Sequence, residues 1–194
     1  MDFYAGGNKD YIRHLCSTAD VLCVQEAKDF VLADMVPDGW EAYQDTSSDA
    51  KQGSGIAVAS SVQVDKWGLV KGCDAPQGGG MLPRWIVWAE ARWEDTGVFT
   101  PISAHEPPGR YSELQPGFTN NLQKVGNSHP DPVIGCDANM PINTLAKQLG
   151  SAYKAVGEGI IGLLSKSPLT DVTVDKTGIT DNQTDHPAVA ATKG

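Results

Sequence analysis

The hydrophobic and polar positions of this chain predict many short strands separated by turns, together with a few helices. Ile12, Leu15 and Cys16 recur at helical spacing, which predicts a helix over 10–18, whereas the run at 20–26 is apolar on both faces and predicts a buried strand. Further strands are expected at 54–60, 62–70, 84–93, 98–104, 133–136, 160–164, 171–174 and 188–191, and further helices at 111–125 and 143–149.

This order of elements indicates one domain of the α/β (α+β) class that contains a sizeable sheet. We expect the segment 62–70 to be the hairpin partner of the strand at 54–60. No repeat, linker or low-complexity segment divides the chain, and 194 residues is an ordinary length for one domain. The sequence therefore predicts a single domain over residues 1–194.

The composition is that of a folded protein, because 40% of the residues are hydrophobic and 20% are charged. No apolar run approaches the roughly 20 residues that a membrane-spanning helix needs. The N-terminus has neither the basic region nor the apolar region of a signal peptide, so we expect a cytoplasmic protein without a membrane partner. The four cysteines form no Cys-x-x-Cys pair, which disfavours a zinc site. The oligomeric state is left open, with a monomer as the default.

Acidic residues outnumber basic ones by 24 to 15, which gives a net charge of −9. An acidic surface disfavours loose, charge-driven binding of nucleic acid, because phosphate backbones attract Lys and Arg. It does not disfavour a metal site, since such a site needs local carboxylates.

Polar residues with catalytic chemistry gather where the expected strands end. The residues at these strand ends are Glu26, His105, Asp137, Asn139, Asp185 and His186. Strand ends commonly carry catalytic groups, because a rigid sheet holds them while the loops leave them accessible. Carboxylates suit Mg²⁺, with Mn²⁺ as an alternative, and histidines can hydrogen-bond phosphoryl oxygens or transfer protons.

Each of these residues also has an ordinary structural interpretation. Glu26 can be a solvated strand end, His105 a loop residue, and Asp137 and Asn139 a turn and helix start, since Asp and Asn are favoured there. The functional interpretation is stronger for the whole set of residues than for any single one. If each residue had only a structural role, polar residues of these types would have to occur by coincidence at several strand ends in the same order along the chain.

Several motifs carry a resemblance to a known family. These are Gln25-Glu26, residues 53–57 (Gly-Ser-Gly-Ile-Ala), Ser103-Ala-His105, residues 134–141 (Ile-Gly-Cys-Asp-Ala-Asn-Met-Pro) and residues 184–189 (Thr-Asp-His-Pro-Ala-Val). In order and spacing, over about residues 10–192, they resemble the endonuclease/exonuclease/phosphatase superfamily, which has the deoxyribonuclease-I-like fold. The resemblance implies a four-layered sandwich, with two mixed β-sheets packed face to face and helices outside, and Mg²⁺-dependent cleavage of phosphoester bonds.

The resemblance also implies roles for individual residues. Glu26 resembles the metal-binding glutamate, and Asp185 the carboxylate that completes the metal environment. Asp137 resembles the aspartate that orients or deprotonates the attacking water, while Asn139 would hold the scissile phosphate or the nucleophile.

The histidines are carried over in the same way. His186 resembles the histidine that hydrogen-bonds a phosphate oxygen, and His105 the second histidine of the nuclease-like members, near the leaving group. Arg110, in the loop after His105, is a candidate for contacting a phosphate, or else an ordinary surface charge.

Two features depart from the family pattern. Members normally begin with a strand that ends in an Asn of the metal site, whereas only nine residues precede the first expected helix here, and Asn8 is the only candidate. Members also carry an Asp that orients the catalytic histidine, and Ile161 stands at that position. The first strand of the fold is therefore expected to be missing.

The sequence as a whole predicts a metal-dependent phosphoesterase, most readily a nuclease that acts on DNA or RNA. One alternative is a phosphomonoesterase or phospholipid-headgroup phosphodiesterase with the same core. The other is a catalytically impaired binding module, which the missing strand and the absent Asp favour.

Overall fold

The computed structural model describes residues 8–27, 31–45, 53–94, 97–176 and 188–193, without the side chains of Asn8 and Glu26. Its helices are α1 (Asn8–Cys16), α2 (Gln115–Ser128) and α3 (Ile142–Leu149), with 3₁₀ turns η1 (Leu32–Asp34) and η2 (Gly109–Tyr111). Its strands are β1 (Val21–Ala27), β2 (Glu41–Gln44), β3 (Gly53–Val58), β4 (Val62–Cys73), β5 (Arg84–Trp93), β6 (Thr100–His105), β7 (Pro132–Asp137), β8 (Lys154–Glu158), β9 (Ile161–Ser165), β10 (Leu169–Asp175) and β11 (Ala188–Lys193).

The strands form two main sheets and a separate pair. The larger sheet has the order β4-β5-β6-β7-β9-β8, and it is mixed because β6 and β7 run parallel while its other neighbours are antiparallel. The smaller sheet, β1-β3-β2, is antiparallel throughout, and β10 pairs with β11. The parallel pair matters most for function, because it brings two strand ends to the same edge of the sheet.

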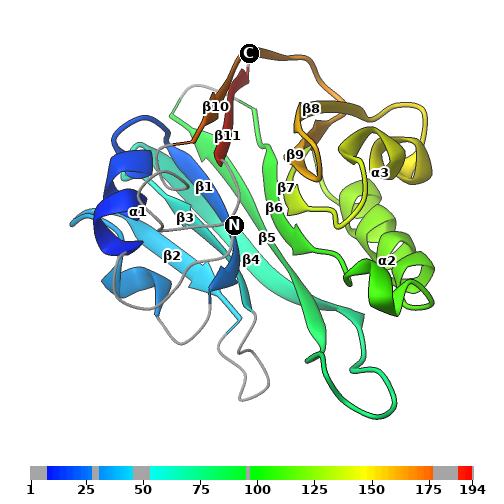
Figure 1. Ribbon diagram of the computed structural model, residues 1–194. Coiled ribbons are helices and arrows are strands. Elements are labelled where there is room, and N and C mark those ends of the chain that lie inside the picture. Colours follow the sequence, from blue (N-terminus) through cyan, green and yellow to red (C-terminus); the bar gives the residue numbers. More distant parts are fainter. Residues whose placement is uncertain (1–7, 28–30, 46–52, 95–96, 177–187, 194) are drawn as a thin grey trace.

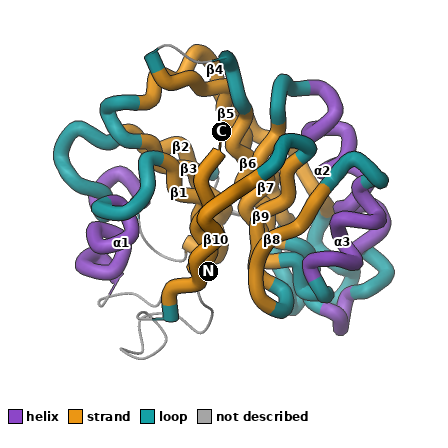
Figure 2. The backbone as a smooth tube through the Cα atoms, turned by 90° about the horizontal axis from the view of Figure 1, so that it is seen from above, coloured by secondary structure: helices purple, strands orange, loops and turns teal. Residues whose placement is uncertain are grey.

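The sheets and helices are stacked in layers (Figure 1). Helix α1 lies on the outer side of the smaller sheet, the two sheets face each other, and α2 and α3 lie beyond the larger sheet, as the view from above also shows (Figure 2). The predicted fold class, an α/β sandwich with helices outside, is confirmed.

Apolar side chains fill each of the three interfaces between layers. Phe118, Leu122 and Leu145 belong to the core beneath α2 and α3, while Ile56 and Val87 belong to the core between the two sheets. A third core packs α1 against the smaller sheet. Burial of these side chains, at about 25 cal/mol per Å² of apolar surface, holds the sheets in fixed positions.

The predicted hairpin between 54–60 and 62–70 is wrong. Strand β3 is flanked on both sides by β1 and β2 and is buried along its whole length, so it has no edge left for β4. The chain instead turns at Ala59, whose carbonyl accepts a hydrogen bond from the N–H of Val62, and enters the other sheet. There β4 is an edge strand with many exposed positions, which explains its weak alternation of polar and apolar residues.

Two strands escaped the sequence prediction, and both lie at sheet edges. Strand β2 is four residues long, and β8 has only partly buried or exposed residues. Neither contains the apolar run that signals a buried strand. Each lies at a sheet edge, where backbone hydrogen bonds to one neighbouring strand hold it and its side chains stay partly exposed.

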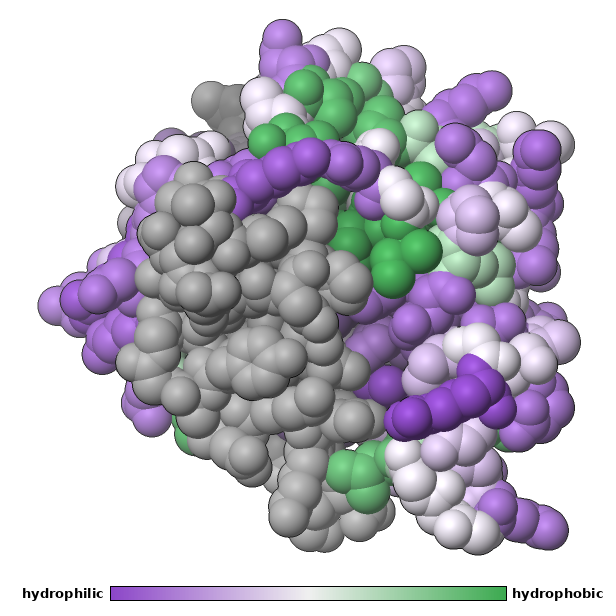
Figure 3. Space-filling view, in the orientation of Figure 1, coloured by the Kyte–Doolittle hydropathy of each residue, from purple (hydrophilic) through white to green (hydrophobic). Residues whose placement is uncertain are grey.

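The visible surface of the described residues is mostly hydrophilic (Figure 3). Hydrophilic residues cover most of the described surface in the orientation of Figure 1, around a smaller group of apolar residues (Figure 3). Among the described helices, none combines the length and the apolar character needed to cross a bilayer.

Candidate active site

The centre of the candidate site is the end of the parallel pair β6 and β7. His105 and Asp137 are the last residues of these strands and stand opposite each other in register. Both are almost completely buried, and His105 Nε2 lies 3.8 Å from Asp137 Oδ2. The two residues that the sequence placed at separate strand ends are therefore neighbours.

Strand β1 of the opposite sheet is tied to this end by Gln25. The buried Gln25 amide donates to Ser103 Oγ at 3.0 Å and to the carbonyl of Gly135 at 3.1 Å, and Ser103 Oγ donates back to the carbonyl of Val24 at 2.8 Å. Ser103 and Gly135 each lie two residues before a strand end. The Gln of the Gln25-Glu26 motif is thus a structural link between the sheets, and it brings the backbone of β1 close to β6 and β7.

Asn139 is held by the loop that follows β7. Its backbone has φ of +46°, in the left-handed region that Asn tolerates better than most residues. Its N–H donates to Asp137 Oδ1 at 3.0 Å, and its side-chain Nδ2 donates to the carbonyl of Glu106 at 2.7 Å. The Asp-x-Asn motif therefore closes on itself and fastens the end of β7 to the end of β6.

Arg84 is a site residue that the sequence analysis did not single out. It opens β5, is 2% exposed, and its Nη1 lies 2.6 Å from Nδ1 of His105. The available signal was a charged residue directly before the apolar run at 85–89, because a cation is rarely buried unless it is paired.

Glu106 is a second residue that was missed. It is fully buried directly after His105, and Thr119 of α2 donates a hydrogen bond to its Oε1 at 2.7 Å. Its Oε2 has no hydrogen-bond partner among the described residues. The pKa of Glu106 is raised to about 7: burial is the main cause, the Thr119 hydrogen bond lowers the pKa, and the Asp137 charge raises it. Glu106 is therefore a carboxyl that can gain or lose a proton near neutral pH.

The remaining predicted residues are placed less closely or lie outside the described part. Arg110 is an exposed residue of η2 whose guanidinium stacks 5.1 Å from the centre of the Tyr111 ring, so the structure records no contact between it and the strand ends. Asp185, His186 and the side chain of Glu26 lie outside the described residues.

Ile161 occupies the position that the family gives to an aspartate. It is buried on β9 and stands in register with Asp137. An aliphatic side chain therefore takes the place beside Asp137 where a further acceptor was expected. Within the described part of the chain, α1 is the first element, and the backbone of the candidate Asn8 belongs to it.

The described residues supply only part of the donor set that a hard divalent cation would need. Asp137 contributes a buried carboxylate at the end of β7, and the Gln25 link brings β1, the strand that contains Glu26, close to β6 and β7. Oxygen ligands of this kind are those that Mg²⁺ and Mn²⁺ prefer. The described side chains contain no group of three metal-ligating residues, and the two expected ligands fall outside them.

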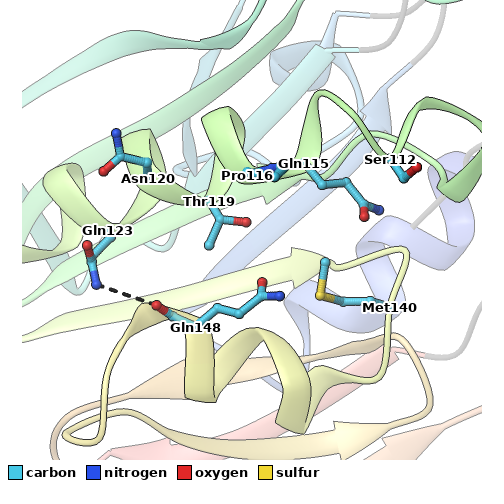
Figure 4. Close-up of a pocket in the computed structure, with 8 residues that line it drawn as sticks. All are labelled: Ser112, Gln115, Pro116, Thr119, Asn120, Gln123, Met140 and Gln148. Carbon is cyan, nitrogen blue, oxygen red and sulfur yellow. Dashed lines mark hydrogen bonds between the residues drawn. The ribbon is translucent and has the colours of Figure 1, made fainter.

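A groove of about 410 Å³ runs beside this centre, between α2 and α3 (Figure 4). It is lined by Ser112, Gln115, Pro116, Thr119, Asn120, Gln123, Met140 and Gln148. The groove adjoins the candidate site at the end of β6 and β7. Thr119 donates a hydrogen bond to Glu106, and Met140 follows Asn139 in the chain. None of the lining residues is charged, so the groove offers hydrogen bonds but cannot neutralise a phosphate.

Known proteins resemble this chain in structure and not in sequence. No protein-family description matches the sequence, and no curated protein sequence is similar to it. TDP2 from Caenorhabditis elegans superposes with a TM-score of 0.69 at 17% identity, covering 94% of this chain and 68% of that one. An endonuclease/exonuclease/phosphatase family protein from Bacteroides thetaiotaomicron gives 0.68 at 13% identity, covering 98% and 86%. The catalytic domain of human Nocturnin, with a bound sulfate anion, gives 0.60 at 11% identity, covering 94% and 78%.

Proposed function

We propose, on the premise that the chain has the fold of the endonuclease/exonuclease/phosphatase superfamily, that this protein is a metal-dependent phosphoesterase and acts as a nuclease on DNA or RNA. The observation that carries the proposal is the pairing of His105 and Asp137 at the ends of parallel strands, with Asn139 tied to both ends. A buried carboxylate, an imidazole and an amide held at one rigid edge are groups that can activate water and bind a phosphoryl group.

Asp137 would orient the attacking water and accept its proton, because its carboxylate is fixed on one side by the N–H of Asn139 and faces His105 on the other. Asn139 would hold the scissile phosphate or the water, and His105 would contact the leaving-group side. His186 would hydrogen-bond a phosphate oxygen. These residues position and polarise, which is most of what phosphoryl transfer requires of a protein.

Glu26 and Asp185 would hold Mg²⁺, or Mn²⁺ in its place. When bound, the cation neutralises negative charge that develops on the phosphoryl oxygens. Glu26 belongs to β1 of the smaller sheet, and Asp185 precedes β11 in the sequence.

Two observations bear on the substrate. The net charge of −9 disfavours unspecific coating of nucleic acid, so binding would rest on the cation and a few basic residues such as Arg110. The uncharged groove between α2 and α3 would accommodate a neutral part of the substrate and not its phosphates.

The deciding experiment offers the purified chain supercoiled plasmid, single-stranded DNA, RNA, a chromogenic phosphomonoester and a phospholipid. Each substrate is tested with Mg²⁺, with Mn²⁺ and with EDTA, and alongside the His186→Gln variant. We expect cleavage of one or more nucleic acids that EDTA abolishes, that added Mg²⁺ restores, and that His186→Gln strongly reduces.

Other outcomes favour the alternatives. Turnover of the monoester or phospholipid alone would assign the protein to those substrates instead. Failure to cleave any ester by a folded protein would favour a catalytically impaired binding module. The specific observation behind that last candidate is Ile161, which puts an aliphatic side chain beside Asp137.

A further inference from the structure

The contact between Arg84 and His105 determines where the imidazole carries its proton. Arg84 Nη1 and His105 Nδ1 are 2.6 Å apart, and both side chains are almost completely buried, with residue exposures of 2% and 3%. A guanidinium has five N–H donors, no acceptor, and no accessible neutral form. In this hydrogen bond Arg84 must therefore donate and Nδ1 must accept.

An accepting Nδ1 leaves the proton of the neutral ring on Nε2. That nitrogen faces Asp137, whose Oδ2 is 3.8 Å away. The ring thus stands between a cation at Nδ1 and an anion beyond Nε2, and this polarity matches an imidazole with its lone pair toward Arg84 and its N–H toward Asp137. The distance to Oδ2 exceeds that of a hydrogen bond, so it is the shorter contact at Nδ1 that fixes the tautomer.

The fold holds Arg84 in place for this contact. Arg84 pairs with Cys73 across β4 and β5. Burial raises the pKa of the Cys73 thiol, and the nearby Arg84 offsets part of that rise. Strand β5 pairs in turn with β6, which ends at His105 and is itself paired with β7. Because both residues are set by strand pairing, the orientation of the ring follows from the sheet and not from a mobile loop.

We infer that Arg84 is a positioning residue that fixes His105 as the Nε2–H tautomer, so that His105 acts as a hydrogen-bond donor to a phosphoryl or leaving-group oxygen and not as the base. The catalytic part of this statement rests on the proposed function, whereas the tautomer does not.

The proton balance of the hydrolysis follows. The water oxygen forms a bond to phosphorus, and the proton of the water passes to the Asp137 carboxylate. The bond from phosphorus to the leaving oxygen breaks, and its electron pair departs with that oxygen, which takes a proton from solvent water. His105 keeps its Nε2 proton throughout and stabilises negative charge by the hydrogen bond that it donates.

The test reads the tautomer directly, by two-bond ¹H–¹⁵N correlation spectra of the full chain labelled at the histidine nitrogens. His105→Gln identifies the His105 signals by their disappearance. In the wild-type protein at neutral pH we expect a protonated Nε2 and an unprotonated Nδ1. A His105 ring that carries its proton on Nδ1, or on both nitrogens, overturns the inference without any variant.

Variants test whether Arg84 is the cause. Arg84→Gln replaces an obligatory donor by an amide that can donate or accept, and we expect a mixture of tautomers and a fall in kcat of about 10–100-fold, the usual cost of removing a partner that orients a histidine. Arg84→Lys has only donors and should restore the wild-type tautomer. Arg92→Gln is the matched control. It removes another arginine of β5, one that forms an ion pair with Asp65 and has no contact with His105 in the part of the chain that the structure describes.

The outcomes separate this inference from the proposed function. An unchanged His105 tautomer in folded Arg84→Gln overturns the role of Arg84, and Arg84→Met serves if the Gln variant does not fold. A wild-type protein that cleaves no phosphoester but has the expected tautomer leaves the geometry intact and removes the catalytic assignment.

Discussion

Two neighbouring regions of this molecule are built in opposite ways. The candidate active site at the end of β6 and β7 gathers buried charged or titratable side chains, each in contact with another group: Arg84, His105, Glu106 and Asp137. The groove between α2 and α3 is open to solvent and has only uncharged lining residues. Burial strengthens electrostatic interactions because it removes competing water, so chemistry is expected at the strand ends, and the groove is suited to recognition.

The largest expected effect separates the regions by activity. Asp137→Asn keeps the shape of the side chain but removes the proton acceptor, and we expect a loss of kcat of about 10²–10⁴-fold, the usual contribution of a general base. Steady-state kinetics on the best substrate measures it. Asp34→Asn, at an exposed position of η1, is the matched control and should leave kcat unchanged. Equal rates for Asp137→Asn and wild type would contradict the assignment of the catalytic centre.

A second prediction concerns pH and the buried carboxyl of Glu106. Its pKa is raised from 4.5 to about 7 in the folded state, so between these pH values the folded protein keeps a proton that the unfolded chain releases. The free energy of unfolding should therefore fall as pH rises from 5 to 7, by about 2 kcal/mol from this group, since one pKa unit corresponds to 1.36 kcal/mol.

Urea unfolding at pH 5, 6 and 7 compares wild type with Glu106→Gln. The variant has no proton to lose, so its stability should fall less over this range, and the difference between the two proteins is the quantity of interest. Glu113→Gln, an exposed change in the following loop, should keep the wild-type dependence. Parallel curves for wild type and Glu106→Gln would show that the carboxyl ionises as readily in the folded protein as in the unfolded chain.

A smaller effect is expected at Thr119, which belongs to both regions. It lines the groove and donates to Glu106, so Thr119→Val removes the one hydrogen bond that this carboxyl accepts from a described side chain. Leaving a buried acceptor unpaired costs about 1–3 kcal/mol in the free energy of unfolding. Thr144→Val, at an exposed position of α3, is the control for the same substitution on a helix. Equal stability of both variants would place Glu106 in a different hydrogen-bond arrangement.

The smallest effect is expected within the groove. Asn120 is exposed on α2 and is one of the lining residues labelled in Figure 4. If the groove binds a neutral part of the substrate, Asn120→Ala should raise KM about two- to tenfold through the loss of one neutral hydrogen bond and leave kcat unchanged. Asn143→Ala on α3, outside the lining residues, is the control. A lower kcat with unchanged KM would mean that the groove takes part in the chemical step.

The strand-end residues could be found from the sequence because buried strands leave a local signal. The apolar run before Asp137 and the one before His105 each end in a polar residue, and a strand end is readable without knowledge of the partner strand. Pairing leaves no such signal, and the predicted hairpin of 54–60 with 62–70 failed for that reason. Whether an apolar strand pairs with its neighbour or crosses to another sheet depends on which edges are already occupied, here both edges of β3.

Arg84 and Glu106 were missed for a related reason. Each is an ordinary charged residue in the sequence, and its meaning depends on a partner far away in the chain: 21 residues separate Arg84 from His105, and 13 separate Glu106 from Thr119. Burial of a charge is a property of the packed layers, and a local pattern of residues does not reveal it.

The sequence by itself determined the class of fold, the positions of most strands and the residues at their ends, because hydrophobic periodicity and polar punctuation are local properties of the chain. Only the tertiary structure decided which ends meet, that Gln25 links the two sheets, and that Arg84 faces Nδ1 of His105. Those facts depend on strand pairing and layer packing, which join segments distant in sequence and bury the charges whose interactions give the site its chemistry.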